Sequence, residues 1–481
     1  MTEIISIQRC NEVYNKIICE PGIAFEMKEY FKFPVPGAKF MPSYRNKYWD
    51  GYIYLFNPIT CSIYAGLNKH IEDFASKRNY KVEYLSDFAA DEFSLKEANE
   101  FIDSLNIPNK FQKRDYQIDA FTYSVRNHRA LLLSPTASGK SFIIYLLTRY
   151  YNARTLIIVP TTSLVSQLSS DFTDYGFQSD GNVHRIFSGM DKQSDKQITI
   201  STWQSIYKLP KEYFRSFDVI IGDEAHLFKA KSLTSIMTKL TDCKYRFGFT
   251  GTLDGSQTHK LVLEGLFGPL KKVISTSELI EQNHLSKFMI KCIVLKYPDA
   301  ERQAISKMDY QSEMDWLVRN DARNRFIKNL TLSLKGNTLL LFQYVEKHGK
   351  VLFDMLKSDN VYFVHGGVDG EDRETIRKIV EQSSSSIIVA SYGTFSTGVN
   401  IRNLHNIIFA SPSKSKIRNL QSIGRGLRKS DTKEIATLYD ISDDLIWKSK
   451  KNFTIQHFAE RVKIYNEEKF DYKIYTVNLK V

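Results

Sequence analysis

One short run of the sequence, SPTASGKS, combines small residues with a lysine and a hydroxyl group in a spacing suited to binding phosphate. It follows the apolar run ALLL and precedes the helix-like segment SFIIYLLTRYY. Backbone N–H groups that converge at a helix N-terminus bind anions, and the helix dipole favours them. Gly139 permits close approach of the backbone, Lys140 is suited to pairing with β- and γ-phosphates, and Ser141 to ligating Mg²⁺. The rest of the predicted loop is Pro135, Thr136, Ala137 and Ser138.

In the segment VIIGDEAH, a pair of acidic residues follows a second apolar run. This pair favours a nucleotide site over the alternative that GKS occurs by chance in a loop. Ser134 takes the position of the usual first glycine, where a small residue at the end of a strand suffices. Asp223 is suited to holding Mg²⁺ through water, and Glu224 to orienting and deprotonating the attacking water. The alternative interpretation is a pair of solvated acids on a loop.

Two further motifs are predicted to act on the same nucleotide. His226 stands beside the acids and is expected to relay the state of the nucleotide to the run TGT; a core histidine is the alternative. In QSIGRGLR, Arg425 and Arg428 lie three residues apart, on one side of a helix, where both can face a phosphate. We interpret them as arginine fingers, against the alternative of a solvated basic helix, and expect Gln421 to orient the water or sense His226.

Short β-branched apolar runs alternate with amphipathic stretches from about residue 130 and again after about residue 330. Near-continuous apolar strands separated by helix-length segments indicate parallel sheets covered on both faces. The sequence therefore predicts an α/β protein with two tandem parallel-sheet domains. The segment 271–290 is polar and is predicted to connect them without a central strand.

The first hundred or so residues follow a different pattern, rich in aromatic residues, Pro and Gly. They predict a small α+β domain with short antiparallel strands and a helix in LNKHIEDFASKRNY, joined to the rest by the acidic stretch 83–103. The expected domains are 1–105, an accessory domain, 106–280, which binds the nucleotide, and 281–481, which carries the arginine fingers.

Composition narrows the class of protein. The 481 residues carry a net charge of +12, which favours a polyanionic partner through counterion release. The five cysteines have no paired CxxC spacing, which argues against a zinc site or a disulfide framework. No signal-peptide pattern or run of 18 apolar residues is present, so we expect a cytoplasmic protein.

The motifs RDYQ, SPTASGKS, DEAH, TGT, TFSTGVN and QSIGRGLR occur in the order found in superfamily-two helicases and translocases, which this sequence resembles over residues 110–430. The resemblance implies two RecA-like domains and an ATP-driven motor that uses Mg²⁺. It implies that Arg114 and Gln117 read the adenine and that Gly398 and Asn400 contact the nucleotide. It also implies contacts to the nucleic acid strand from Thr161, Thr202, Trp203 and Thr397.

A closer resemblance extends over nearly the whole chain. FMPSYRNKYWDGYIYLF, VASYGTFSTGVNIRNLHNI and NEEKFDYKIYTVNL are similar to segments of the UvsW helicase family of tailed phages. This resemblance implies a recombination and repair helicase that acts on branched DNA by migrating junctions, regressing stalled forks and removing R-loops. We expect a monomer whose partners are single-stranded DNA, branched duplexes and RNA–DNA hybrids. The alternatives are an RNA helicase with the same engine, a nucleic-acid-binding protein that uses ATP as a structural ligand, and a metabolite kinase.

Cationic and aromatic residues outside the motifs suggest further contacts. Arg45, Lys47, Tyr48 and Trp49 lie in a turn-rich region, and we hypothesise that they engage the duplex or the branch point. A core built on a buried Trp49 is the competing account. The basic runs SKSKIRNLQ and WKSKKNF either extend the strand contact or form a solvated surface, and Phe395 either stacks on a base or packs internally.

Overall fold

The computed structural model divides into two compact units, residues 1–134 with 139–273, and residues 135–138 with 274–481. It describes residues 3–35, 37–87, 90–253, 256–394, 401, 403–411, 415, 423–424, 427 and 435–479, with the backbone alone at 258. Among these residues, no helix is both long and apolar enough to cross a membrane. All five cysteines are free thiols.

The first unit contains a sheet of seven described strands, all parallel, in the order β10-β11-β9-β12-β13-β8-β14. The predicted apolar runs ALLL, TLIIV, ITIST, VIIGD and YRFGFT form the five central members, and β10 and β14 extend the two edges. The strands are β8 (Arg129–Leu133), β9 (Thr155–Val159), β10 (Val183–Ile186), β11 (Ile198–Thr202), β12 (Val219–Asp223), β13 (Tyr245–Thr250) and β14 (Leu270–Lys272).

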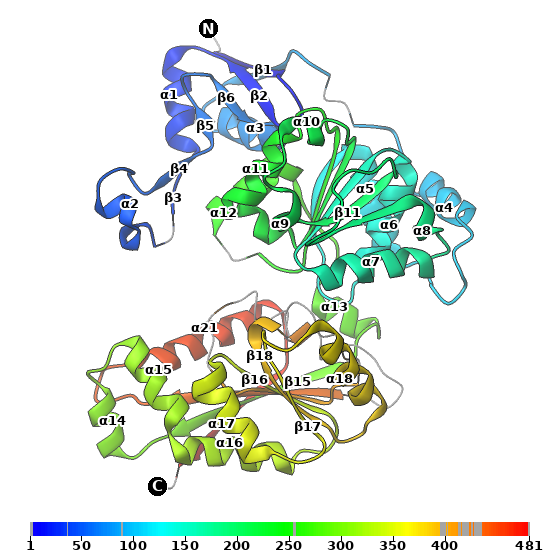
Figure 1. Cartoon of the computed structure of the whole chain (residues 1–481). Helices are drawn as coiled ribbons and strands as arrows, with labels where there is room; N and C mark the ends of the chain where they lie inside the picture. The colour runs from blue at the N-terminus through cyan, green and yellow to red at the C-terminus, as the bar shows by residue number, and fades with distance from the viewer. Residues whose placement is uncertain are drawn as a thin grey trace. The chain divides into compact units, whose positions relative to one another are not determined.

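Helices cover both faces of this sheet, and neighbouring strand residues alternate between two cores (Figure 1). In β9, for example, Ile157 lies in one core and Ile158 in the other. The first core is closed by α4 (Leu95–Ser104), α5 (Asp115–Asn127), α6 (Lys140–Tyr151) and α7 (Thr162–Asp174), with the short α8 (Ser179–Asn182) after α7. The second is closed by α9 (Trp203–Ile206), α10 (Lys211–Phe214), η3 (Ala225–Lys229), α11 (Lys231–Lys239) and α12 (Gln257–Phe267).

The N-terminal domain shares the second of these cores with the nucleotide-binding sheet. Gly66 approaches α12 so closely that a Cβ atom there would lie 2.0 Å from the Glu264 carbonyl oxygen. His70 Nε2 lies 2.8 Å from the carboxylate of Glu264, and Arg129 donates to both the carbonyl and the carboxylate of Glu12. The N-terminal domain is therefore built into the first unit by close backbone packing as well as by polar contacts.

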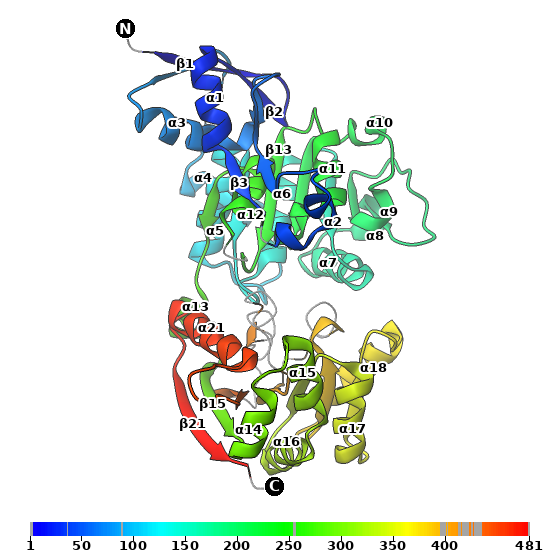
Figure 2. The same cartoon turned by 90° about the vertical axis from the view of Figure 1, so that its left-hand side faces the viewer.

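The N-terminal domain itself is a mixed sheet in the order β5-β6-β2-β1-β7, with helices α1 and α3 (Figure 2). Its short antiparallel pairs and the helix in LNKHIEDFASKRNY match the sequence predictions. Its elements are β1 (Ile4–Arg9), β2 (Tyr14–Ile18), α1 (Pro21–Tyr30), β5 (Phe56–Asn57), β6 (Ser62–Tyr64), η2 (Ala65–Leu67), α3 (Asn68–Ser76) and β7 (Lys81–Tyr84).

The second unit also contains seven described parallel strands, in the order β17-β18-β16-β19-β20-β15-β21. The strands are β15 (Lys287–Lys296), β16 (Thr338–Phe342), β17 (Val361–Val364), β18 (Ile387–Ser391), β19 (Asn406–Phe409), β20 (Ile435–Asp444) and β21 (Tyr472–Asn478). The helices of this unit are α13 (Thr276–Glu281), α14 (Asp299–Ile305), α15 (Tyr310–Arg319), α16 (Asp321–Ser333), the π-helix η4 (Val345–Gly349), α17 (Lys350–Leu356), α18 (Gly370–Gln382) and α21 (Phe453–Glu467).

The prediction of a connection without a strand over 271–290 was wrong. Strand β14 ends in this segment at Lys272, and β15 begins in it at Lys287 and lies inside the second sheet, between β20 and β21 (Figure 2). Lys287 and Lys291 interrupt the apolar residues of β15, because its first half buries only alternate side chains. Because polar residues alternate with apolar ones in the first half of β15, the sequence showed no continuous apolar run there. Continuous burial begins at Cys292.

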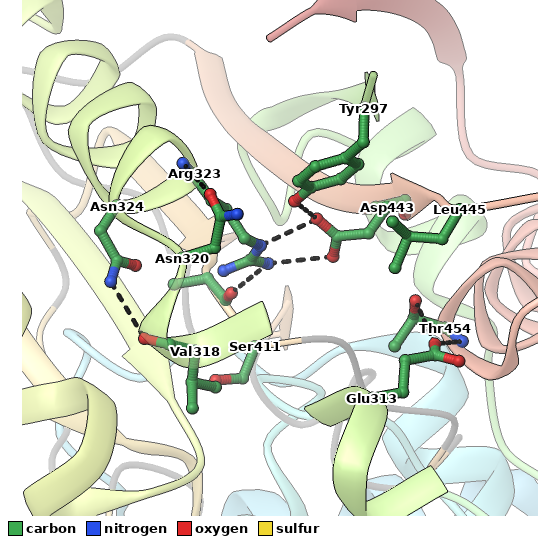
Figure 3. Close-up of polar contacts among 12 residues, drawn as sticks. Tyr297, Glu313, Val318, Asn320, Arg323, Asn324, Ser411, Asp443, Leu445 and Thr454 are labelled. Atoms are coloured by element: carbon green, nitrogen blue, oxygen red, sulfur yellow. Dashed lines mark hydrogen bonds and ion pairs between the residues drawn. The ribbon is translucent and has the colours of Figure 1, made fainter. Parts of the chain in front are cut away.

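A buried polar network fixes the exits of two strands in the second unit (Figure 3). The Asp443 carboxylate accepts hydrogen bonds from Arg323 Nε at 2.8 Å and from the Tyr297 hydroxyl at 2.7 Å. Arg323 also donates to the Ala410 carbonyl, directly after β19. Burial alone would lower the pKa of Arg323, but the oxygens of Asp443 and Tyr297 outweigh it and raise that pKa. The guanidinium is therefore fully charged and fully buried.

Candidate active site

The predicted phosphate loop lies between the end of β8 and the start of α6, as its spacing indicates. Gly139 precedes the helix in the left-handed region, with φ of 83°. This positive φ strains any residue other than glycine, and a Cβ atom would also lie 2.2 Å from the Gln117 side-chain nitrogen, which would have to move. Ser134 is fully buried, and its N–H donates to the Thr250 carbonyl, so a small side chain does suffice at the strand end.

Lys140 and Ser141 form the first turn of α6, where the positive end of the helix dipole attracts an anion. Lys140 Nζ lies 3.5 Å from Glu224 Oε1, so the structure brings the loop lysine and the predicted base together. The segment that carries Arg114 and Gln117 begins α5: Gln117 accepts from the Arg114 N–H, and Arg114 donates to the Tyr116 hydroxyl at 2.7 Å.

The two acids take different backbone conformations. Asp223 is the last residue of β12, held between β9 and β13. Glu224 follows with φ of 51° and ψ of 51°, a left-handed conformation that costs a residue other than glycine about 1–2 kcal/mol. This turn directs the two adjacent carboxylates differently, while the Glu224 N–H still donates to Asp223 Oδ1 at 2.9 Å.

His226 links the acids to the TGT run, as predicted. Its Nδ1 lies 3.0 Å from Thr250 Oγ1 and 3.3 Å from Glu224 Oε2. The Thr250 hydroxyl donates its one proton to the Thr252 carbonyl, so its oxygen must accept from the histidine. This requirement assigns the ring proton to Nδ1. His226 is 8% exposed, so it is a buried histidine with polar partners, and its role as a relay stays a prediction.

The donors at this site fit a hard cation. A serine hydroxyl and an aspartate carboxylate are oxygen ligands of the kind that Mg²⁺ takes, together with substrate phosphates and water. Among the residues that the structure describes, no group of three His, Cys, Asp or Glu side chains forms an all-protein metal cage. The site is therefore suited to a metal that arrives with a phosphorylated ligand.

Removal from water raises the pKa of Asp223 from 3.8 to about 6, although Lys140 opposes the shift. The folded protein thus holds this proton more tightly than the unfolded chain, and ionisation costs stability. The cost is complete above about pH 6, shrinks as the pH falls from 6 to 3.8, and is absent below both values. A carboxylate that destabilises the ligand-free fold at neutral pH is expected where a cation is to be bound.

We therefore predict that Asp223→Asn raises the thermal midpoint of the nucleotide-free protein at pH 7.5 and has no such effect near pH 4. The substituted side chain keeps an oxygen for the Glu224 N–H but carries no charge. The measurement is thermal unfolding of both proteins at the two pH values. Asp195→Asn, at an exposed position, is the matched control and should leave both midpoints unchanged. An equal or lower midpoint for Asp223→Asn at pH 7.5 would contradict the prediction.

The predicted strand contacts of the first unit occupy different environments. Thr161 caps α7 and is half-buried, with its hydroxyl 3.0 Å from that of Ser163. Thr202 is 4% exposed, and its hydroxyl lies 2.9 Å from that of Ser205. The half-buried Trp203 packs against the core, with its ring 5.8 Å from that of Tyr207. Thr161 and Trp203 are both partly exposed, whereas Thr202 is buried, and the contacts of all three to a strand stay predictions.

Several predicted site residues lie outside the described part of the chain: Phe395, Thr397, Gly398, Asn400, Gln421, Arg425 and Arg428. Their roles stay predictions. Sequence reasoning also missed one contact in the described part, since the Tyr175 hydroxyl lies 3.0 Å from Ser141 Oγ. No motif marks Tyr175, which follows the last residue of α7.

Known proteins match this chain from end to end. The family model "DNA helicase UvsW, N-terminal" matches residues 5–85, "Type III restriction enzyme, res subunit" matches 110–255, and "Helicase conserved C-terminal domain" matches 321–430. The chain is 35% identical to the ATP-dependent DNA helicase uvsW of Enterobacteria phage T4, over 96% of this chain and 97% of that protein. The chain belongs to the UvsW helicase family.

Structural comparison agrees with this membership of the UvsW family. A crystal structure of T4 UvsW matches with a TM-score of 0.53 at 34% identity, covering 100% of both chains. A more distant relative is the DNA 3'-5' translocase XPB2 of Sulfurisphaera tokodaii, 25% identical over 69% of this chain and 82% of that protein. The prediction of two RecA-like parallel-sheet domains after a small α+β domain is confirmed.

Proposed function

We propose that this chain is an ATP-dependent DNA helicase of phage recombination and repair, and that it works on branched DNA. The observation that carries the proposal is the contact set of Lys140, Glu224, His226 and Thr250 in a chain whose T4 relative is named an ATP-dependent DNA helicase. We further propose that it acts as a monomer in the host cytoplasm, with branched duplexes and RNA–DNA hybrids among its substrates.

The described geometry supports a division of labour in hydrolysis. Lys140 is paired with Glu224, and a triphosphate at the start of α6 offers the lysine a stronger partner. Its transfer to the phosphate leaves the Glu224 carboxylate free to accept a proton from water. Mg²⁺, held by Ser141 and Asp223, would neutralise charge on the phosphates.

The same geometry suggests how a change at the nucleotide is passed to the TGT run. His226 contacts both Glu224 and Thr250, so a change in the Glu224 environment alters a hydrogen bond to the TGT run at the end of β13. We propose Arg425 and Arg428 of the second RecA-like domain as the partners of the γ-phosphate. We keep the domain limits 1–105, 106–280 and 281–481 as part of this proposal.

An arm of the N-terminal domain is the proposed contact to the branch point. It consists of β3 (Lys32–Pro34), η1 (Ala38–Phe40), α2 (Pro42–Arg45) and β4 (Tyr52–Tyr54), and it stands out from the N-terminal sheet (Figure 1). Tyr48 is 85% and Phe40 66% exposed. Trp49 is half-exposed and donates to the Tyr52 carbonyl, so the alternative of a buried Trp49 core was wrong. Exposed rings beside lysines are suited to stacking on unpaired bases.

ATP turnover and strand separation test the proposal. Turnover is measured with single-stranded DNA, forked DNA and RNA of the same sequence, and separation on forks, four-way junctions and R-loops. We expect stronger stimulation by DNA than by RNA, and ATP-dependent separation of forks. Equal stimulation by RNA would favour the RNA-helicase alternative, and DNA binding without turnover would favour ATP as a structural ligand.

A double substitution in the arm tests its role in the same assays. Replacing Tyr48 and Phe40 together by alanine should weaken fork binding at least about tenfold, since each ring stacked on a base contributes about 1–3 kcal/mol. Stimulation of turnover by single-stranded DNA should persist. Ile59→Ala, which removes a 93% exposed side chain elsewhere in the domain, is the control. Full fork affinity in the double variant would refute the role of the arm.

A further inference from the structure

Tyr175 is the one aromatic hydroxyl that the described structure places on the predicted metal ligand Ser141, at 3.0 Å between the two oxygens. It lies directly after α7 and is 7% exposed. Its position is fixed from several sides. Its N–H donates to the Asp171 carbonyl, and its ring packs edge-on against Phe111 at 4.9 Å and Phe142 at 5.3 Å between centroids.

We propose that Tyr175 is a positioning residue that accepts the hydroxyl proton of Ser141 and so turns the Ser141 oxygen toward Mg²⁺. The inference rests on the proposed role of Ser141 as a ligand. A serine oxygen that binds a cation uses a lone pair for it, and its own proton then needs an acceptor. Partners of this kind fix the orientation of metal ligands and tune their affinity.

The chemistry of the tyrosine suits this task. A tyrosine side chain has an ordinary pKa of about 10, so it is a neutral hydroxyl at physiological pH. A neutral hydroxyl has an oxygen that accepts the serine proton and brings no negative charge beside the phosphates. Because the ring is wedged among Phe111, Phe142 and Tyr145, the oxygen is held in place before any ligand arrives.

The neighbouring Tyr145 offers a matched control. Its ring lies 5.2 Å from that of Tyr175, and its hydroxyl accepts from Arg149 at 3.1 Å instead of meeting Ser141. Tyr145→Phe and Tyr175→Phe therefore remove the same group from the same aromatic cluster. A difference between the two variants at the nucleotide site then reports the contact to Ser141 and not the packing of the cluster.

The test is a magnesium titration of nucleotide binding in the full-length protein, with a fluorescent non-hydrolysable ATP analogue as the probe. We expect Tyr175→Phe to need about tenfold more Mg²⁺ for half-maximal binding, within the range found when partners of metal ligands are removed. Tyr145→Phe should titrate like the wild type. Ser141→Ala should need more Mg²⁺ than the wild type, and adding Tyr175→Phe to it should change nothing further. Thermal unfolding of each variant identifies any loss of fold.

The outcomes separate this inference from the function on which it rests. If Ser141→Ala shifts the titration and Tyr175→Phe does not, the positioning role is overturned and the ligand role of Ser141 stands. If Ser141→Ala also titrates like the wild type, the proposed ligand set is wrong. A shift from Tyr175→Phe that persists unchanged in the Ser141→Ala background would show that the tyrosine acts by another route and would also overturn the inference.

Discussion

Glu224→Gln is expected to lower DNA-stimulated ATP turnover by at least about a hundredfold, because general-base catalysis contributes factors of about 10²–10⁴. Glutamine keeps the shape of the side chain but cannot accept a proton from water at neutral pH. Nucleotide binding should remain, since the substitution also releases Lys140 from its contact with the carboxylate at 3.5 Å. Steady-state turnover and the binding of a fluorescent ATP analogue measure the two effects separately.

The control for this substitution is Glu212→Gln, an exposed position on α10 that should turn over like the wild type. Full turnover in Glu224→Gln would contradict the assignment of Glu224 as the general base in hydrolysis. Loss of nucleotide binding together with turnover would instead show that the site had rearranged around Lys140. Only loss of turnover with binding retained fits a base that acts on the attacking water.

Apolar runs predicted the central strands of both sheets, because parallel strands covered on both faces must be apolar throughout. Every residue of β9, β11 and β16 is buried, and each appears in the sequence as a short continuous run. The same reasoning placed Asp223 at the end of a buried strand, and Asp223 is the last residue of β12.

Some strands near the sheet margins escaped this reasoning, although the edge strand β17 does appear as an apolar run. Strand β21 is mostly exposed and reads YKIYTVN, with no apolar run to mark it. Its pairing with β15 depends on a long-range register that begins at Ile290 opposite Tyr472. The composition of one segment does not identify the strand with which it pairs. The edge that β21 forms could therefore not be derived from local sequence pattern.

The site shows a similar division. Motif order placed His226 near the TGT run, and the structure shows the contact between His226 and Thr250. The motifs did not predict that Glu224 adopts a left-handed conformation or that Tyr175 meets Ser141, a contact between residues 34 positions apart. The roles of Gln421, Arg425 and Arg428 depend on residues outside the described structure and stay predictions.

Asp443→Asn is expected to lower the free energy of unfolding by about 3–5 kcal/mol, the usual cost of breaking a buried ion pair from one side. Arg323 and Asp443 are both fully buried, and Arg323 approaches the carboxylate with two nitrogens, at 2.8 and 3.1 Å. Asparagine would leave a charged guanidinium without a counter-ion, where solvent cannot replace it. Denaturation by guanidinium chloride measures the loss, and Asp315→Asn, in an exposed pair with Lys347, should change it little.

A double variant, Arg323→Met with Asp443→Leu, separates the charge from the packing. Buried ion pairs replaced by apolar residues of similar volume often leave stability unchanged or raise it, so this protein should recover most of the loss. It should not recover the hydrogen bond from Arg323 to Ala410, at 2.8 Å, which fixes the chain directly after β19. Stability near wild type with reduced ATP turnover would then assign the network to positioning the end of β19. Recovery of both would show that the charges serve stability alone, and no recovery of stability would contradict the ion-pair argument.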